Sequence, residues 1–319
     1  MNLDLVQVCF NLLGLFLLIA VGFGMVRLGV VSRDISGPFS RFLLKVTLPC
    51  TIFTSLLRPY EPSFFRKVVI ILALGMILFP VNALISWLLA RLFRVPQNHR
   101  GVWAFCATFC NTGFMGFPIV LALFGEEGLS MAVVLNITFN VLVYSMGARM
   151  ICADRAGEGE GVHIQWHTVL FTTINFATVL GLIFYFTHLS IPAAVLTPLT
   201  HLSNITTPLS MIVTGINLSN GNWTSLFSKK DAITSSLARL VICPAANLLI
   251  LHAAGTLLHL RGSAILSVVF VVLAMPTPAV ATILAENYQA DQEFAALTVF
   301  LSSLLCILTI PLMTMLLPI

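Results

Sequence analysis

Two short strings interrupt otherwise apolar stretches of the chain: Asn111-Thr112-Gly113-Phe114-Met115-Gly116-Phe117-Pro118 and Met275-Pro276-Thr277-Pro278. Proline removes a backbone donor and clashes with the preceding turn, so two prolines two residues apart break a helix at the second string. Two glycines and a proline weaken the first string in the same way. Lipid cannot solvate the backbone groups that such breaks release, so in a membrane both breaks must face protein or a water-filled cavity.

The composition around these strings is that of a membrane protein. Of the 319 residues, 58% are hydrophobic and 9% are charged, and the mean hydropathy is +1.01. A soluble domain carries about a quarter charged residues, so a water-soluble globule is excluded. The net charge of +4 is spread over short loops, which argues against a nucleic-acid partner. Apolar runs of sufficient length predict ten spans: 5–27, 38–57, 68–93, 101–124, 129–152, 169–187, 193–218, 232–258, 264–285 and 295–317.

The polar stretch 154–165 (DRAGEGEGVHIQ) divides the chain into two five-span halves, residues 1–153 and 166–319. Because each half has an odd number of spans, the second half enters the membrane in the opposite orientation. The two interrupted spans, the fourth and the ninth, then occupy corresponding positions. The predicted fold is an all-α polytopic membrane protein of ten transmembrane helices in two inverted five-helix repeats, with broken crossing helices four and nine. This is an architecture of secondary transporters.

The basic residues predict the orientation. Loops on the side of the 154–165 linker carry ten of the sixteen Lys and Arg residues, the opposite loops carry four, and Lys45 and Arg239 lie inside spans. Positive loops stay in the cytoplasm. We therefore expect a multi-pass protein of the plasma (inner) membrane with the linker inside and both termini outside.

The sign of the interior charge favours an anionic solute. All twelve Asp and Glu residues fall in loops or at span ends, whereas the innermost charges are basic. A helix that restarts inside the membrane also points unpaired N–H groups and a positive dipole end at the break. Arg239 either snorkels to the headgroups or attracts the anion at a distance from the cytoplasmic side. If it attracts at a distance, Arg239→Lys should retain most of the activity.

Several strings are similar to those of the auxin efflux carrier family of membrane transporters, which includes plant auxin exporters and bacterial malonate-type carriers. They are Leu48-Pro49-Cys50-Thr51-Ile52-Phe53, the run from Asn111 to Ile119, Phe124-Gly125-Glu126-Glu127-Gly128, Arg239 with Pro244, and Met275-Pro276 through Tyr288. The resemblance covers nearly the whole chain. It implies ten helices in two inverted repeats, a central crossover site for organic anions, and a transport bundle that moves against a scaffold, often a dimer interface.

The chain also departs from the plant branch of that family. Cys110 stands where that branch has a proline, and Thr54-Ser55 occupy the region of its asparagines. These departures favour a small mono- or dicarboxylate over an auxin-like indole acid. Coupling to H+, coupling to Na+ and uniport stay open as alternatives. The expected substrate-binding residues are Asn111, Thr112, Gly113, Gly116, Pro118, Pro276, Thr277, Pro278, Thr54, Asn140 and Arg239.

Two other function classes remain to be weighed. An intramembrane enzyme would need paired acids, or His with a carboxylate, at membrane depth, and the sequence supplies neither. We therefore expect no catalytic residues, no cofactor and no metal ligands. A membrane sensor that binds a ligand without moving it stays open as an alternative, as does an exporter of an auxin-like indole acid.

Overall fold

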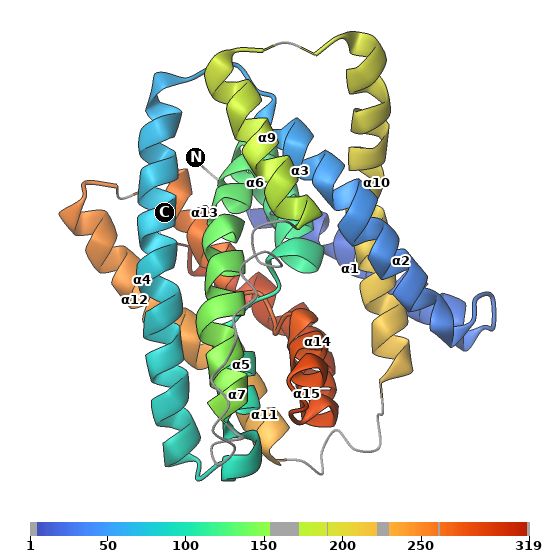
Figure 1. Cartoon of the computed structure of the whole chain (residues 1–319), viewed down its shortest axis with the longest axis vertical. Helices are drawn as coiled ribbons and strands as arrows, with labels where there is room; N and C mark the ends of the chain where they lie inside the picture. Colours follow the sequence, from blue (N-terminus) through green and yellow to red (C-terminus); the bar gives the residue numbers. More distant parts are fainter. Residues whose placement is uncertain (1–4, 154–171, 190, 222–229, 261, 318–319) are drawn as a thin grey trace.

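The computed structural model describes residues 5–153, 172–189, 191–221, 230–260 and 262–317, and these residues are helical with no strand among them (Figure 1). Five continuous helical stretches in this part are long and apolar enough to cross a membrane: 10–27, 62–92, 97–152, 230–257 and 292–315. Thr173–Thr187 and Ala264–Leu273 are shorter apolar helices. The polytopic membrane class expected from the composition is thereby confirmed, while the 154–165 linker lies outside the described residues.

The helices pack as two bundles. The first bundle consists of α1 (Leu5–Arg27), α2 (Ser36–Phe42), the π-turn η2 (Leu43–Thr47), α3 (Leu48–Leu56), α9 (Thr173–Thr187) and α10 (Ala193–Asn220). The second bundle consists of α4 (Pro62–Leu92), α5 (Arg100–Thr108), η4 (Thr112–Gly116), α6 (Phe117–Leu142), η5 (Val143–Gly147), α7 (Ala148–Cys152), α11 (Lys230–Leu237), η7 (Ala238–Ile242), α12 (Cys243–Leu257), α13 (Ala264–Leu273), α14 (Val280–Asn287) and α15 (Gln292–Met315). In Figure 1, α10 lies on the right, and α4 and α12 lie on the left.

The first bundle is held by close backbone contact. At the crossing of α1 and α10, a Cβ on Gly22 would collide with the backbone of Ile212, and a Cβ on Gly215 would collide with the carbonyl of Ile19. Helices in lipid lack a hydrophobic driving force for association, so small residues that let backbones approach supply much of the packing energy. The α1–α10 pair therefore forms a tightly packed unit.

Both interrupted spans are broken in the structure, although one break falls earlier than the sequence pattern indicates. Helix α5 ends at Thr108, and residues 109–111 are not helical before the chain restarts in the π-turn η4. The two glycines of the first string thus lie inside the restart and not in the gap. Pro118 lies at the junction of η4 and α6, where its missing N–H removes one backbone hydrogen bond from the helix.

The second break lies where the prolines predict it. Helix α13 ends at Leu273, residues 274–279 are not helical, and α14 begins at Val280. Within α6, Gly125 adopts φ 65° and ψ −162°, a backbone conformation that side-chain-bearing residues rarely reach. Gly125 therefore bends the chain between the fourth and fifth expected spans.

Candidate functional site

The two breaks are bonded to each other. The backbone N–H of Asn111 donates to the carbonyl of Pro276 over 2.7 Å. The hydroxyl of Thr277 donates to the carbonyl of Cys106 over 2.9 Å, and its N–H donates to Ser302 Oγ over 3.1 Å. Two segments more than 160 residues apart in sequence therefore cross at one point, each satisfying backbone groups that the other leaves open.

Asn111 caps the restart of its own helix. Its Oδ1 accepts from the N–H of Phe114 over 3.2 Å, and its backbone carbonyl accepts from the N–H of Gly116 over 3.0 Å. Because the cap requires an acceptor, the amide oxygen must face the helix. The amide nitrogen, a donor, is left for a ligand.

A cavity of about 170 Å³ adjoins the crossing. The restart after each break lines it, and so do the η2–α3 segment and the start of α9 from the first bundle. None of the residues lining it is charged. They are Leu44, Leu48, Asn111, Thr112, Gly113, Phe114, Phe117, Asn136, Phe139, Asn140, Val143, Tyr144, Ile174, Pro278, Ala279, Val280 and Ile283.

Arg239 lies behind the crossing, at the ends of the two helices that stop there. Its Nη1 donates to the carbonyls of Thr108 over 2.6 Å and Ala107 over 3.4 Å, and its Nη2 donates to the carbonyl of Leu273. The side chain is 0% exposed and forms no ion pair with any residue in the described part of the chain. The guanidinium therefore neither lines the cavity nor reaches the headgroups, and it compensates the negative ends of α5 and α13.

The crossing thus separates two signs of charge. The C-terminal ends of α5 and α13 meet Arg239, whereas the N-terminal ends of the restarted helices, at Thr112 and Val280, line the cavity. The first N–H groups of a helix lack an intrahelical acceptor and carry partial positive charge. The cavity is consequently an electropositive space with no acidic residue among its lining.

Asparagines on α6 complete the polar wall. The hydroxyl of Thr112 donates to Asn136 Oδ1 over 2.6 Å, which leaves the Asn136 amide nitrogen as a donor. One turn further along, Asn140 Nδ2 donates over 2.8 Å to Oδ1 of Asn175, which stands in the first turn of α9. This second bond joins the two bundles beside the cavity.

The structure distributes the expected binding residues over three places. The cavity is lined by Asn111, Thr112, Gly113, Asn140 and Pro278, while Gly116, Pro118, Pro276 and Thr277 belong to the crossing without lining the cavity. Thr54 and Arg239 lie elsewhere: the Thr54 hydroxyl is bonded to the carbonyl of Cys50 over 2.9 Å and lies 3.2 Å from Ser203 Oγ, between α3 and α10. Asn136 and Asn175 were not among the expected binding residues, although Asn136 precedes Asn140 by four residues and shares its helix face.

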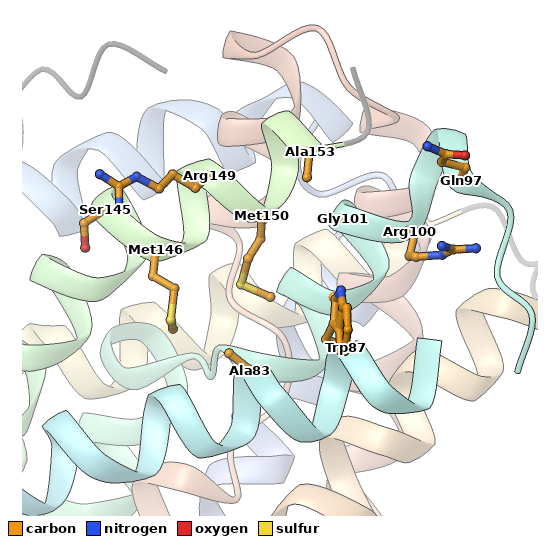
Figure 2. A pocket seen from close by; sticks show the side chains of 11 residues that line it. Ala83, Trp87, Gln97, Arg100, Gly101, Ser145, Met146, Arg149, Met150 and Ala153 are labelled. Atoms are coloured by element: carbon orange, nitrogen blue, oxygen red, sulfur yellow. The ribbon is translucent and has the colours of Figure 1, made fainter. Parts of the chain in front are cut away.

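A second cavity, of about 510 Å³, lies between α4, α5 and the η5–α7 segment (Figure 2). It shares no lining residue with the cavity at the crossing. Both cavities use η5, since Tyr144 lines the first, and Ser145 and Met146 line the second.

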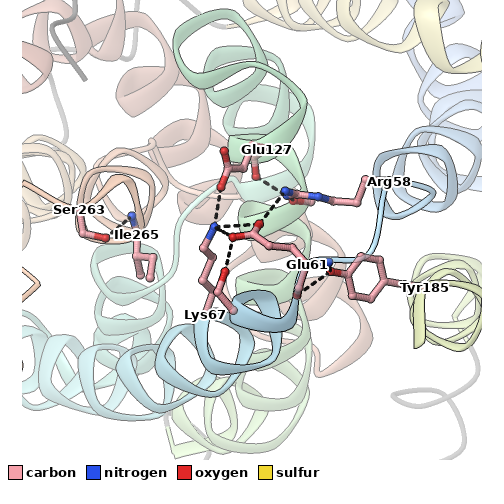
Figure 3. Close-up of polar contacts among 9 residues, drawn as sticks. Arg58, Glu61, Lys67, Glu127, Tyr185, Ser263 and Ile265 are labelled. Atoms are coloured by element: carbon pink, nitrogen blue, oxygen red, sulfur yellow. Dashed lines mark hydrogen bonds and ion pairs between the residues drawn. The ribbon is translucent and has the colours of Figure 1, made fainter. Parts of the chain in front are cut away.

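A group of ion pairs lies at the other end of α9, and hydrogen bonding with Tyr185 links it to the first bundle (Figure 3). In this group, which we call the Arg58 network, Glu61 pairs with Arg58 and Lys67 at 3.2 Å, and Lys67 pairs with Glu127 at 2.8 Å. Arg58 Nη1 also donates to Ser130 Oγ over 3.2 Å, and the N–H of Glu61 donates to the hydroxyl of Tyr185 over 2.8 Å. Because Tyr185 follows Ile174 by eleven residues on α9, the network lies about 16 Å along the helix from the cavity.

The contacts of the Arg58 network favour the ionised form of Glu61. Hydrogen bonds from the Ser63 hydroxyl and from Lys67, together with the charges of Lys67 and Arg58, lower the pKa of the Glu61 carboxyl below its ordinary value. The Glu61 carboxyl is therefore ionised near neutral pH.

A multi-pass helical membrane protein with two broken helices that cross at an uncharged cavity has the general construction of membrane transporters. The chain belongs to the membrane transport protein family, whose sequence profile matches residues 7–314, and this confirms the resemblance to auxin efflux carriers. An uncharacterized transporter of Methanothermobacter thermautotrophicus is 30% identical over 305 residues, which cover 95% of this chain and 96% of the relative. The uncharacterized transporter MJ1031 of Methanocaldococcus jannaschii is 24% identical over 302 residues, covering 93% of this chain and 94% of the relative. The family is one of transporters and not of enzymes.

Proposed function

We propose that the protein is a secondary transporter of small organic anions, and that the anion's carboxylate binds in the cavity at the crossing. The observation that carries the proposal is the separation of helix ends: Arg239 occupies the two negative ends, and the two positive ends line a cavity without an acid. A carboxylate there accepts from the Asn111 and Asn136 amides and lies in the positive field of both helix restarts. An uncharged donor set holds the anion without a tight ion pair, which favours release.

Transport follows from the position of the cavity between the bundles. Leu44, Leu48 and Ile174 belong to the first bundle, and the remaining lining belongs to the second. Movement of the second bundle against the first would expose the cavity first toward the linker end and then toward the end now tied by the Arg58 network. Alternating access of this kind needs the hydrogen bond between Glu61 and Tyr185 to open once in each cycle.

The arrangement in the membrane forms part of the proposal. Residues 1–153 and 166–319 are two inverted five-helix repeats in ten spans, with residues 154–165 as a cytoplasmic linker and both termini outside the plasma membrane. Support comes from the one broken helix in each half and from the excess of basic residues on the linker side. The family resemblance adds the expectation of a homodimer through the scaffold. H+ and Na+ are the candidate coupling ions.

The test compares two variants of Asn111 in a binding assay with a panel of mono- and dicarboxylates, read as thermal stabilisation of the purified protein. Asn111→Ala removes a hydrogen bond to the anion worth about 1 to 3 kcal/mol, or about 5- to 150-fold in affinity. Asn111→Asp adds repulsion and should bind more weakly still. Asn98→Asp, at an exposed position outside the cavity, is the matched control.

The outcomes separate the function classes. Equal binding by Asn111→Asp and the unmodified protein would show that the site takes no anion. Anion binding without accumulation in vesicles carrying only this protein would favour the sensor alternative. Preference for an indole acid over short carboxylates would favour the auxin-like alternative.

A further inference from the structure

The larger cavity, of about 510 Å³, lies where α4 and α7 end and α5 begins. Figure 2 shows Ala83, Trp87, Met146 and Met150 directed into this space, while Arg100 and Arg149 stand at its two sides. The floor is therefore apolar and the rim is cationic. No acidic residue lines the cavity.

The arginines beside this cavity have positive charge that no acidic residue in the described part of the chain neutralises. Arg100 uses Nε and Nη2 on the carbonyl of Val95 at 3.1 and 2.9 Å, which leaves Nη1 free of that bond. Arg149 is exposed and has no ion pair in the described part of the chain. The guanidinium of Arg91 lies 3.6 Å from the centre of the Trp87 ring. Trp beside Arg at a helix end is typical of the level of lipid headgroups.

An apolar surface leads into the cavity from the outer face of α4. Leu84 is 57% exposed, Leu88 is 52% exposed, and Trp87 between them is 41% exposed. In a membrane protein this face meets acyl chains. A chain lying along it could enter the cavity without leaving an apolar environment.

We propose that this cavity binds one anionic phospholipid, with the phosphate at the arginine-bearing rim, at Arg149, and part of an acyl chain against Ala83, Met146 and Met150. Free phosphate would satisfy the rim but leave the apolar floor empty, and a lipid of zero net charge would leave the rim uncompensated. The site is also connected to the transport cavity through the π-turn η5, because Met146 on this turn lines the larger cavity and Tyr144 on the same turn lines the cavity at the crossing. A lipid bound there would stabilise the position of η5, and with it one side of the anion cavity.

The test is native mass spectrometry of the full chain in detergent, titrated with dioleoylphosphatidylglycerol, with dioleoylphosphatidylcholine, or with inorganic phosphate. Arg149→Gln removes one rim charge and should weaken phosphatidylglycerol binding about fivefold, the effect of about 1 kcal/mol per arginine near a headgroup. Ala83→Trp fills the apolar floor of the cavity. It should weaken phosphatidylglycerol binding although every arginine is retained. Arg66→Gln, at an exposed arginine near the Arg58 network, is the matched control and should change nothing.

The proposal is supported if the protein retains phosphatidylglycerol in preference to phosphatidylcholine, and if Arg149→Gln reduces this preference while Arg66→Gln does not. Equal retention of the two lipids, or equal effects of Arg149→Gln and Arg66→Gln, would overturn it. Phosphate binding accompanied by unchanged lipid affinity in Ala83→Trp would also overturn it, because the site would then take a free anion. If Ala83→Trp fails to fold, the exposed Arg149→Gln variant decides.

Discussion

Arg239 offers the sharpest test of how the crossing is built. Replacing it with methionine keeps most of its bulk and removes its charge and all of its donors. The buried carbonyls of Thr108 and Leu273 then lose their hydrogen-bond donor. The negative C-terminal ends of α5 and α13 also lose the positive charge that compensates them. The two helices should no longer be held at their present distance.

The size of the effect follows from the contacts. Two buried carbonyls left unsatisfied cost about 1 to 3 kcal/mol each, so Arg239→Met should lose roughly 2 to 6 kcal/mol. A domain is stable by only about 5 to 15 kcal/mol. Arg239→Lys keeps the charge but cannot place two separate N–H groups on two helix ends as the planar guanidinium does. Its loss should be intermediate.

Thermal unfolding in detergent without substrate measures this directly, with Arg66→Met as the surface control. The expected order of melting temperature is unmodified protein, then Arg239→Lys, then Arg239→Met. The sequence position alone indicates a different role, in which Arg239 attracts the anion at a distance. In that case all melting temperatures would be equal, and removing the charge would slow uptake in a salt-dependent way. An unchanged melting temperature in Arg239→Met would refute the capping role.

Two further outcomes test the bundles. Glu61 has a pKa below its ordinary value, so its stabilisation is present above the ordinary carboxyl pKa and is lost as the pH falls through the lowered one. Acid should therefore lower the melting temperature of the unmodified protein more than that of Glu61→Gln, and parallel curves would contradict the role of the network. Gly215→Ala should lose about 1 to 3 kcal/mol, because its Cβ meets the carbonyl of Ile19, whereas Gly14→Ala in α1 has open space and should be neutral. Equal melting temperatures of these two variants would show that the α1–α10 crossing can relax.

The sequence predicts the breaks because their cause is local. Pro276 and Pro278 break a helix wherever they stand, and the structure has its gap at 274–279. The sequence places the first break too late, because the glycines of the first string are tolerated inside a helix. The non-helical segment 109–111 is instead held by a hydrogen bond to a distant part of the chain. The acceptor is the carbonyl of Pro276, to which the N–H of Asn111 donates.

The role of Arg239 could not be predicted because it depends on two distant helix ends. Thr108 lies 131 residues from Arg239, and Leu273 lies 34 residues from it. Nothing in the spacing says that these carbonyls converge. The Asn140 and Asn175 pair poses the same problem, because one member belongs to each bundle. The sequence shows that a charge lies within a span, but only tertiary structure shows what the charge compensates.

The charge of the crossing leads to an expectation about coupling. Each restarted helix contributes roughly half a positive charge at its N-terminal end, so the two ends together balance about one negative charge. Arg239 adds little to this balance because the negative ends of α5 and α13 already offset it. A monocarboxylate should therefore enter the cavity without a co-ion, whereas a dicarboxylate would bring a surplus charge into a space that no basic residue lines. Uptake of a dicarboxylate should then require protonation of the substrate or an accompanying Na+, and uptake of a monocarboxylate should not. Measured in vesicles with imposed H+ or Na+ gradients, equal gradient dependence for both substrates would refute this charge balance.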